Sequence, residues 1–114
     1  MPVLTIYYDE SLDDAVRAHC AAIQEGLEAV MRDVLVADPA KCQVVLVVAR
    51  HASPKRVHVA LQYRAKPHRT RAVVAEAMNQ VASVLHGALG CGLHIRAFDI
   101  DQSFLHALDT DGPG

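Results

Sequence analysis

The sequence predicts an α/β fold in which two β-α-β repeats form a four-stranded sheet with two helices on one face. The order strand, helix, strand occurs twice along 114 residues, a length that suits a single domain. Apolar positions of the two predicted helices correspond at a constant shift of 58 residues, as from Val16 to Val74. A strand-helix-strand crossover is right-handed and parallel in nearly all known proteins. Two such units therefore build one sheet with both helices on the same side.

The first repeat begins with a short strand and continues into an amphipathic helix. Residues 3–8 are rich in β-branched and aromatic side chains, which favours a strand. Ser11 is the predicted N-cap of the helix that follows. Apolar side chains then recur every three or four residues, which predicts one buried stripe that includes Cys20, until Asp38-Pro39 ends the helix. The stripe consists of Leu12, Val16, Cys20, Ile23, Leu27, Val30 and Val34.

The predicted second strand is unusually apolar. Residues 44–48 form a run of five aliphatic side chains, which is typical of a strand covered on both faces. Two helices on one side of the sheet leave its other side uncovered. Copies of the same sheet are the simplest cover for such a face, so we expect a homo-oligomer.

The second repeat has the same order of elements. Residues 56–63 are the predicted third strand, and residues 93–100 are the fourth. The helix between them begins at Arg69 and ends at Gly90 and Gly92, because glycine commonly closes a helix. Its apolar stripe consists of Val74, Met78, Val81, Leu85 and Ala88.

The two repeats predict a single domain over residues 1–108, with halves at about 1–50 and 56–108. The fourth strand runs on into a short apolar segment. Residues 109–114 are mostly Asp and Gly, so we expect a flexible tail there. The apolar segment contains Phe104, Leu105 and Leu108.

Composition excludes several classes of protein. Apolar residues make up 52 per cent, yet no apolar run approaches the ~20 residues of a membrane span. Residues 1–10 lack the basic start and the long apolar stretch of a signal peptide. The three cysteines and seven histidines show no disulfide or metal-ligand spacing, which favours a reducing compartment and no metal. We therefore expect a cytoplasmic protein that does not bind membranes. The cysteines are Cys20, Cys42 and Cys91.

Positive charge is concentrated in one acid-free segment. Residues 50–71 hold seven of the eleven Lys and Arg residues and no Asp or Glu. Faces that bind nucleic acid usually carry more total charge or stacking aromatics, whereas this chain has a net charge of −2 and 4 per cent aromatic residues. The segment therefore favours a pocket for a small anionic substrate and no nucleic-acid partner. An ordinary solvated loop is the alternative.

The start of the chain, Met-Pro-Val-Leu-Thr-Ile, together with a duplicated β-α-β unit of this length, resembles the tautomerase superfamily. Within it, the sequence is most similar to the 5-carboxymethyl-2-hydroxymuconate isomerase group. Residues 56–61 resemble that group's third strand, and residues 97–101 resemble the end of its fourth. The resemblance implies a homotrimer without a cofactor, an isomerase of aromatic-compound catabolism, and an N-terminal proline that acts as general base.

Pro2 is the predicted catalytic base. Removal of Met1 leaves Pro2 with a free secondary amine. An α-amino group has a pKa near ~8, and burial together with nearby cations lowers that pKa toward neutrality. A base with a pKa near the working pH suits proton abstraction beside a carbonyl. If Met1 is retained, the nitrogen is an amide and cannot act as a base, and Pro2 then only starts an edge strand.

Three cations are the predicted substrate-binding residues. By the resemblance, a substrate-gripping arginine lies in the loop before the second helix, where this chain has Lys66, with Arg69 as the alternative match. Arg64 lies close by and is expected to steady the developing oxyanion. The family's second arginine lies at the start of the second strand, where this chain reads Lys41-Cys42-Gln43.

These observations predict a tautomerase that moves a proton on a small unsaturated keto or enol acid. The alternative is a non-catalytic trimeric protein of the same fold that binds a small ligand or a partner. The missing arginine before Gln43 favours that alternative. His58 and His94 stand singly on predicted strands and are expected at the surface or at an interface.

Overall fold

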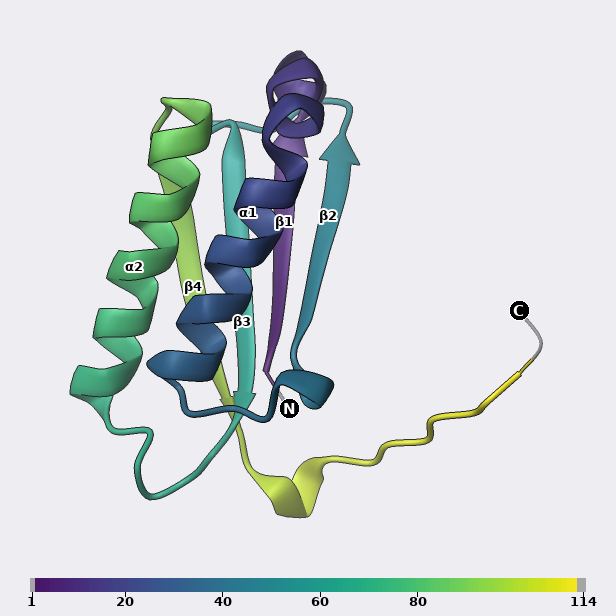
Figure 1. The fold of residues 1–114 in the computed structure, drawn as a ribbon, viewed down its shortest axis with the longest axis vertical. Coiled ribbons are helices and arrows are strands. Elements are labelled where there is room, and N and C mark those ends of the chain that lie inside the picture. Colours follow the sequence, from purple (N-terminus) through teal and green to yellow (C-terminus); the bar gives the residue numbers. More distant parts are fainter. Residues whose placement is uncertain (1, 113–114) are drawn as a thin grey trace.

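The computed structural model describes residues 2–112 and has two layers, a sheet and two helices that lie on one of its faces (Figure 1). The predicted α/β fold is confirmed. The bounds of its elements agree with the predicted ones to within two residues, except that α1 ends at Asp33, well before the predicted break at Asp38-Pro39. The elements in order are β1 (Val3–Asp9), α1 (Asp13–Asp33), β2 (Gln43–Ala49), β3 (Val57–Arg64), α2 (Arg71–Leu89) and β4 (Leu93–Ile100). The short 3-10 turns are η1 (Glu10–Leu12), η2 (Pro39–Lys41) and η3 (Gln102–Phe104).

The strands are arranged in the order β2-β1-β3-β4. β1 pairs with β2 in parallel, and β3 pairs with β4 in parallel, so each half is one β-α-β unit as predicted. The two units join through the antiparallel central pair β1 and β3, in which Val3 lies opposite Gln62. This pairing places the start of β1 beside the end of β3, at the same end of the sheet.

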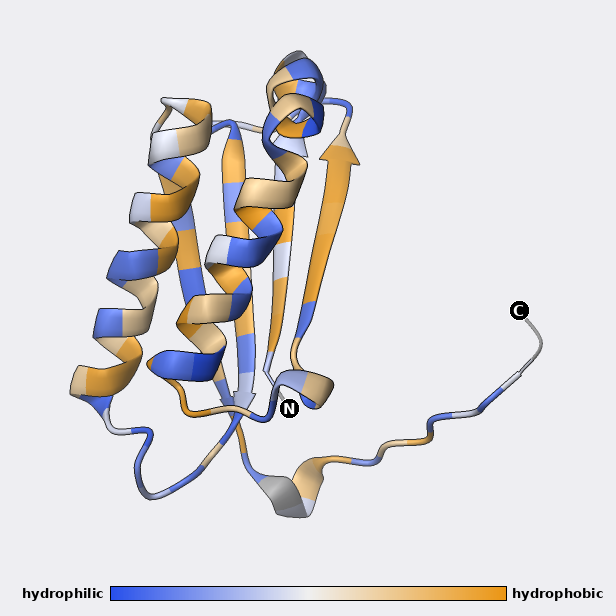
Figure 2. Ribbon diagram, in the orientation of Figure 1, coloured by the Kyte–Doolittle hydropathy of each residue, from blue (hydrophilic) through white to orange (hydrophobic). Residues whose placement is uncertain are grey.

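The core lies between the sheet and the helices. Alternate residues of β1 and β3 face the helices, because successive side chains of a strand point to opposite faces. Most of the predicted helical stripe positions are buried against them, and Figure 2 shows the hydrophobic colouring along the helices and strands. Burial of each large aliphatic side chain contributes about 1.5–3 kcal/mol. The fully buried residues include Leu4, Ile6, Ile23, Leu27, Leu61, Val81 and Leu85.

Besides the position of its end, two local predictions at α1 are wrong. Cys20 lies on the apolar stripe of α1 but is exposed. Helical periodicity sets the direction of a side chain, whereas burial also requires a neighbouring element that covers it. Ser11 is not the N-cap of α1. Instead, the side chain of Asp9 accepts a hydrogen bond from the Ser11 backbone N–H and caps η1, and α1 begins at Asp13.

The face of the sheet opposite the helices carries apolar side chains. Tyr7 is 43 per cent exposed and Phe98 is 50 per cent exposed. Val47 of β2 pairs with Tyr7 and lies on this same face. His58 and His94 are paired across β3 and β4 here, with their ring centroids 5.2 Å apart. We call this surface the helix-free face.

The chain beyond β4 forms η3 and then an extended segment that leaves the body of the molecule (Figure 1). Residues 105–112 contain no helix or strand. Residues 113 and 114 of the predicted flexible tail lie outside the described residues. Among the described residues, neither long helix has a stretch apolar enough to cross a bilayer.

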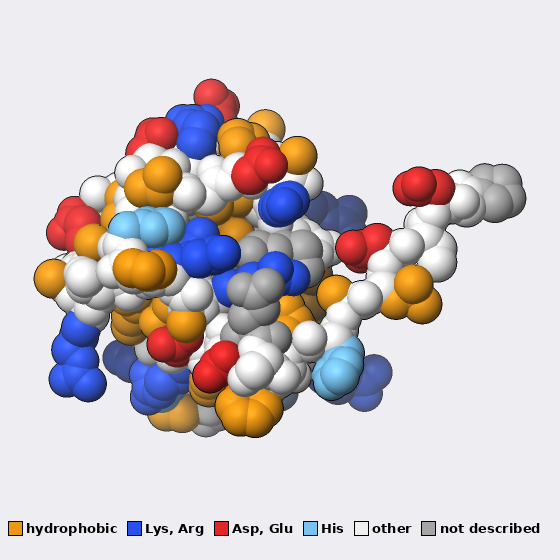
Figure 3. Space-filling model, turned by 90° about the horizontal axis from the view of Figure 1, so that it is seen from below, with side chains coloured by type: hydrophobic (Ala, Val, Ile, Leu, Met, Phe, Trp, Pro, Cys, Tyr) orange, Lys and Arg blue, Asp and Glu red, His pale blue; other side chains and the backbone are white. Residues whose placement is uncertain are grey.

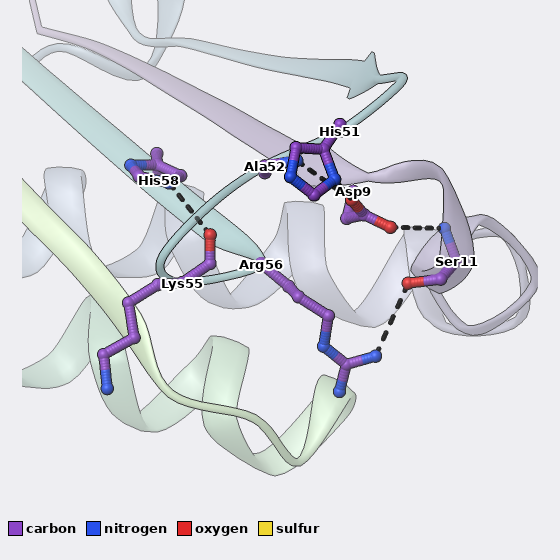
Figure 4. Close-up of polar contacts among 7 residues, drawn as sticks. All are labelled: Asp9, Ser11, His51, Ala52, Lys55, Arg56 and His58. Carbon is purple, nitrogen blue, oxygen red and sulfur yellow. Dashed lines mark hydrogen bonds and ion pairs between the residues drawn. The ribbon is translucent and has the colours of Figure 1, made fainter.

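A cluster of polar contacts at the end of β1 ties η1 to the connection between β2 and β3 (Figure 4). The Asp9 carboxylate accepts hydrogen bonds from the Ser11 N–H at 3.0 Å and from the Ala52 N–H at 2.9 Å. The His51 ring nitrogen Nδ1 lies 3.9 Å from Asp9 Oδ1. The hydrogen bonds from Ser11 are the main reason that the pKa of Asp9 falls to about 2.

Asp9→Asn should therefore lower the melting temperature at neutral pH, because an amide is a weaker acceptor than a carboxylate. An acid with a lowered pKa stabilises the fold above its ordinary pKa of 3.8, and this stabilisation is lost as the pH falls toward 2. The difference in melting temperature between wild type and variant should shrink over that range. Glu25→Gln, at an exposed site on α1, is the control. A difference that stays constant down to about pH 2 would contradict the assignment.

Candidate functional site

A pocket of about 400 Å³ lies at the end of the sheet where β1 begins and β3 ends. Its walls come from four segments that are distant in sequence: the start of β1, the connection from α1 to β2, the connection from β3 to α2, and the tail after η3. Figure 3 views the molecule from this end and shows Lys and Arg side chains gathered near the middle of the face. We call this cavity the Pro2 pocket.

All four residues that the sequence singles out line the Pro2 pocket. They are Pro2, Arg64, Lys66 and Arg69. The antiparallel pairing of β1 with β3 is the reason, because it places Pro2 next to the last residues of β3. Lys66 and Arg69 follow directly in the connection to α2, so the chain needs only a few residues to bring three cations to one proline.

Pro2 is buried in the wall of the pocket. Its side chain is less than 2 per cent exposed. Its carbonyl accepts a hydrogen bond from the Gln43 N–H at 3.1 Å, which ties it to the first residue of β2. Met1, whose retention or removal decides whether the Pro2 nitrogen is an amide or an amine, lies outside the described residues.

Arg69 is fixed by backbone carbonyls of two other segments. Its Nε donates to the Leu35 carbonyl at 3.1 Å, and its Nη1 donates to the Arg64 carbonyl at 2.9 Å. The His68 ring nitrogen Nε2 lies 3.1 Å from the same Leu35 carbonyl. Burial lowers the pKa of Arg69, although arginine stays charged in proteins. The guanidinium is therefore a positioned cation rather than a mobile surface charge.

Arg64 is the one side chain in the described part of the chain with a buried polar atom that lacks a hydrogen-bond partner. That atom is its Nε, and the residue lines the Pro2 pocket. An unsatisfied buried donor costs about 1–3 kcal/mol. An anion that supplied an acceptor here would remove that cost.

Sequence reasoning missed several residues of the pocket wall. Lys41 reaches it from η2, which starts where the Asp38 carboxylate accepts a hydrogen bond from the Ala40 N–H at 3.0 Å. Asp38 and Asp109 also line the pocket, although the acid-free segment 50–71 had predicted an anion pocket without carboxylates. The break at Asp38-Pro39 signalled a turn here, but nothing in the local sequence indicated which cavity the turn would face.

Val36, also in the wall of the pocket, has an unusual backbone. Its φ angle is 52°, in the left-handed region that a β-branched residue rarely adopts. Such a conformation costs of order 1–3 kcal/mol and persists where the surrounding structure imposes it. The contacts of His68 and Arg69 with the neighbouring Leu35 carbonyl hold this segment in place.

No metal centre is evident in the part of the chain that the structure describes, where no three His, Cys, Asp or Glu side chains gather as ligands. The Cys42 thiol, beside the pocket wall, has a pKa raised by burial. It donates a hydrogen bond to the Asp38 carbonyl at 3.4 Å, so it belongs to the turn rather than to a reactive thiolate site.

No protein-family model and no curated protein sequence matches the chain. Solved structures do match its fold. The fused 4-OT protein Q0, a wild-type symmetric trimer, has a TM-score of 0.74 at 14% identity, covering 92% of this chain and 90% of that one. N1, a member of the cis-3-chloroacrylic acid dehalogenase (cis-CaaD) family, has a TM-score of 0.75 at 18% identity, with coverages of 92% and 79%.

A 5-carboxymethyl-2-hydroxymuconate delta-isomerase has a TM-score of 0.69 at 17% identity, and the match covers 97% of this chain and 89% of that one. At these identities the likeness establishes the fold alone. The chain therefore shares the fold of these three proteins, which confirms the predicted tautomerase-like fold. The isomerase group named from the sequence is one among several groups with this fold.

Proposed function

We propose that the protein is a tautomerase that uses the nitrogen of Pro2 as general base on a small unsaturated keto or enol acid. The observation that carries the proposal is the convergence of a buried proline and three cations on one pocket. The proposal requires that Met1 is removed. The decisive test compares turnover of phenylenolpyruvate by protein with and without Met1, after intact mass has established which form is present.

In the proposed reaction, the Pro2 amine takes a proton from an enol oxygen or from a carbon next to a carbonyl. The electron pair of the broken bond moves along the conjugated system, and the same proton returns to another carbon or to the oxygen. Substrate and product are isomers, so no oxidant or second reactant is needed. Burial and the adjacent cations keep the amine largely neutral at the working pH.

The cations have two proposed roles, binding of the substrate carboxylate and stabilisation of the developing negative charge. The fixed guanidinium of Arg69 and the exposed Lys66 bind the substrate carboxylate. Arg64, with its unpartnered Nε, stabilises the negative charge that develops on the carbonyl oxygen. Lys41 supplies a cation close to the position where the family's second arginine is missing.

We also propose that the protein assembles as a homotrimer through the helix-free face. Half-exposed Tyr7 and Phe98 on this face favour a partner that buries them. We expect sedimentation at micromolar concentration to give a mass about three times the 12.3 kDa of the chain. Val47→Asp should dissociate the assembly, whereas Val48→Asp, on the other side of the same strand, should not. A wild-type protein that sediments as a monomer would refute the trimer.

A second candidate function is a non-catalytic trimer that binds a small anion. The observation that favours it is the sequence Lys41-Cys42-Gln43, together with Lys66 where the family has an arginine. Lysine lacks the planar fork that grips a carboxylate. Binding of keto acids without turnover by the Met1-free protein would favour this function over the tautomerase.

A further inference from the structure

A second pocket, of about 490 Å³, lies between α2 and the edge strand β4. We propose that it is a separate binding site for a small carboxylic acid with an apolar or aromatic body. Neither Pro2 nor Lys66 belongs to its wall among the described residues. The site is therefore argued independently of the proposed tautomerase chemistry. We call it the α2–β4 groove.

The floor of the groove is apolar. Val74 and Met78 of α2 meet Ile95 and Ala97 of β4 there. Val74 is buried, and the other three are half-buried. The groove therefore exposes apolar surface to water, and its burial by a ligand is favourable. Its volume falls within the range of pockets that hold small organic molecules. This floor would receive the apolar body of the ligand.

The rim of the groove is mainly cationic. Arg71 lies at the start of α2, and Arg96 lies on β4, and both are exposed. Arg69 lines the groove as well, whereas Asp99 is the one carboxylate in its wall among the described residues. Three arginines against one aspartate among the lining residues favour an anionic ligand. Arg96 starts from the helix-free face of the edge strand, and its Nη1 donates to the Ile95 carbonyl at 2.9 Å. A planar carboxylate matches the paired N–H donors of arginine.

Tyr63 provides a polar group inside the groove. It is 8 per cent exposed, and its hydroxyl makes no hydrogen bond to another described residue. Burial, and then the charge of Asp99, raise the pKa of Tyr63, so the hydroxyl stays protonated and can donate a hydrogen bond. The Tyr63 hydroxyl is not among the buried atoms without a partner, so it is open to solvent inside the groove. A ligand oxygen could therefore take the place of water as its acceptor.

Arg69 separates the groove from the Pro2 pocket. It lines both cavities, and its contacts with the Leu35 and Arg64 carbonyls hold it in place between them. The two sites therefore share one wall and differ in all the other residues used here. Ligand binding in the groove does not require a free amine at Pro2.

The test is a titration of the assembled protein with 4-phenylbutyrate, followed by amide chemical shifts and by calorimetry. We expect shifts at residues 74–78 and 93–99, and binding at least about tenfold weaker for the neutral 4-phenylbutanamide. Ala75→Trp places a ring in the groove from an exposed helical position and should weaken binding at least tenfold. Ala72→Trp, also exposed on α2 but outside the groove, should leave it unchanged. Tyr63→Phe should weaken binding about fivefold.

Three results would each overturn the proposal: shifts confined to the Pro2 pocket, equal effects of the two tryptophan variants, or no binding at millimolar probe. If the probe does not bind and Ala75→Trp changes the oligomeric state, the groove is an interface between copies instead. Protein that retains Met1 should bind the probe as tightly as Met1-free protein. Loss of tautomerase activity in that form therefore leaves this test intact.

Discussion

Protein from which Met1 has been removed should convert phenylenolpyruvate to its keto form roughly 10²–10⁴-fold faster than protein that retains Met1, which is the usual contribution of a general base. The reason is electronic. An amide nitrogen has no basic lone pair, whereas the freed secondary amine of Pro2 has one, in a pocket that also holds three of the predicted cations. Absorbance of the enol measures both rates, and intact mass identifies each form.

Pro2→Ala, also with Met1 removed, distinguishes the amine from the fold. The variant keeps a free amine but makes it primary and more mobile, so turnover should fall strongly. The melting temperature should change little, because the hydrogen bond from the Gln43 N–H to the carbonyl of residue 2 is kept. Equal rates for the processed and Met1-retaining forms would exclude proline chemistry.

The rate of the processed protein should rise with pH as the Pro2 amine loses its proton. An unperturbed α-amino group has a pKa near ~8, and burial and neighbouring cations shift it downward. The ascending limb should therefore lie between neutrality and that reference value. If the midpoint of the ascending limb lies above the α-amino reference value, the cations do not act on this amine.

Arg69→Ala should weaken the binding of a small dicarboxylate such as fumarate by about 1.5–3 kcal/mol, the worth of a charge-assisted hydrogen bond. Arg69 is fixed before the ligand arrives, because the Leu35 and Arg64 carbonyls hold its guanidinium. Lys66→Ala should weaken binding of the dicarboxylate less, since Lys66 is exposed and exposed ion pairs contribute about 0–1 kcal/mol. Calorimetry at low salt measures both variants.

His68→Ala is the matched control for Arg69→Ala. It removes the other side chain that contacts the Leu35 carbonyl but leaves the guanidinium in place. Arg69→Lys keeps the charge and loses the planar fork, so its affinity should lie between wild type and Arg69→Ala. If His68→Ala weakens binding as much as Arg69→Ala does, Arg69 only positions the segment around Val36 and does not bind the ligand.

The sequence alone was sufficient for the elements of the fold. Each strand and helix depends on side chains close together in the chain, and their periods of two and 3.6 residues are visible without a structure. Gly90 illustrates this at a single residue: it closes α2 with a φ angle of 66°, which glycine adopts without strain. The duplicated β-α-β order then left few possible topologies.

The candidate site was only partly predictable, because local patterns do not show which distant segments come together. Pro2 and the cations at and after the end of β3 could be named because their residue types carry chemistry wherever they stand. Lys41 and the carboxylates of Asp38 and Asp109 enter the pocket from segments that no local pattern connects to it. Exposure of Cys20 likewise depends on which element covers that turn of α1.

The sequence by itself determined where the strands and α2 lie, how the two repeats are ordered, and which residue types could act as base and anion binders, but it placed the end of α1 too late. Tertiary structure decided which of them meet. Arg69 became a fixed cation through a carbonyl 34 residues earlier in the chain, at Leu35. The α2–β4 groove exists only because α2 packs beside the edge strand. Local patterns follow from bonded neighbours, whereas a site is assembled by the packing of segments that are distant in sequence.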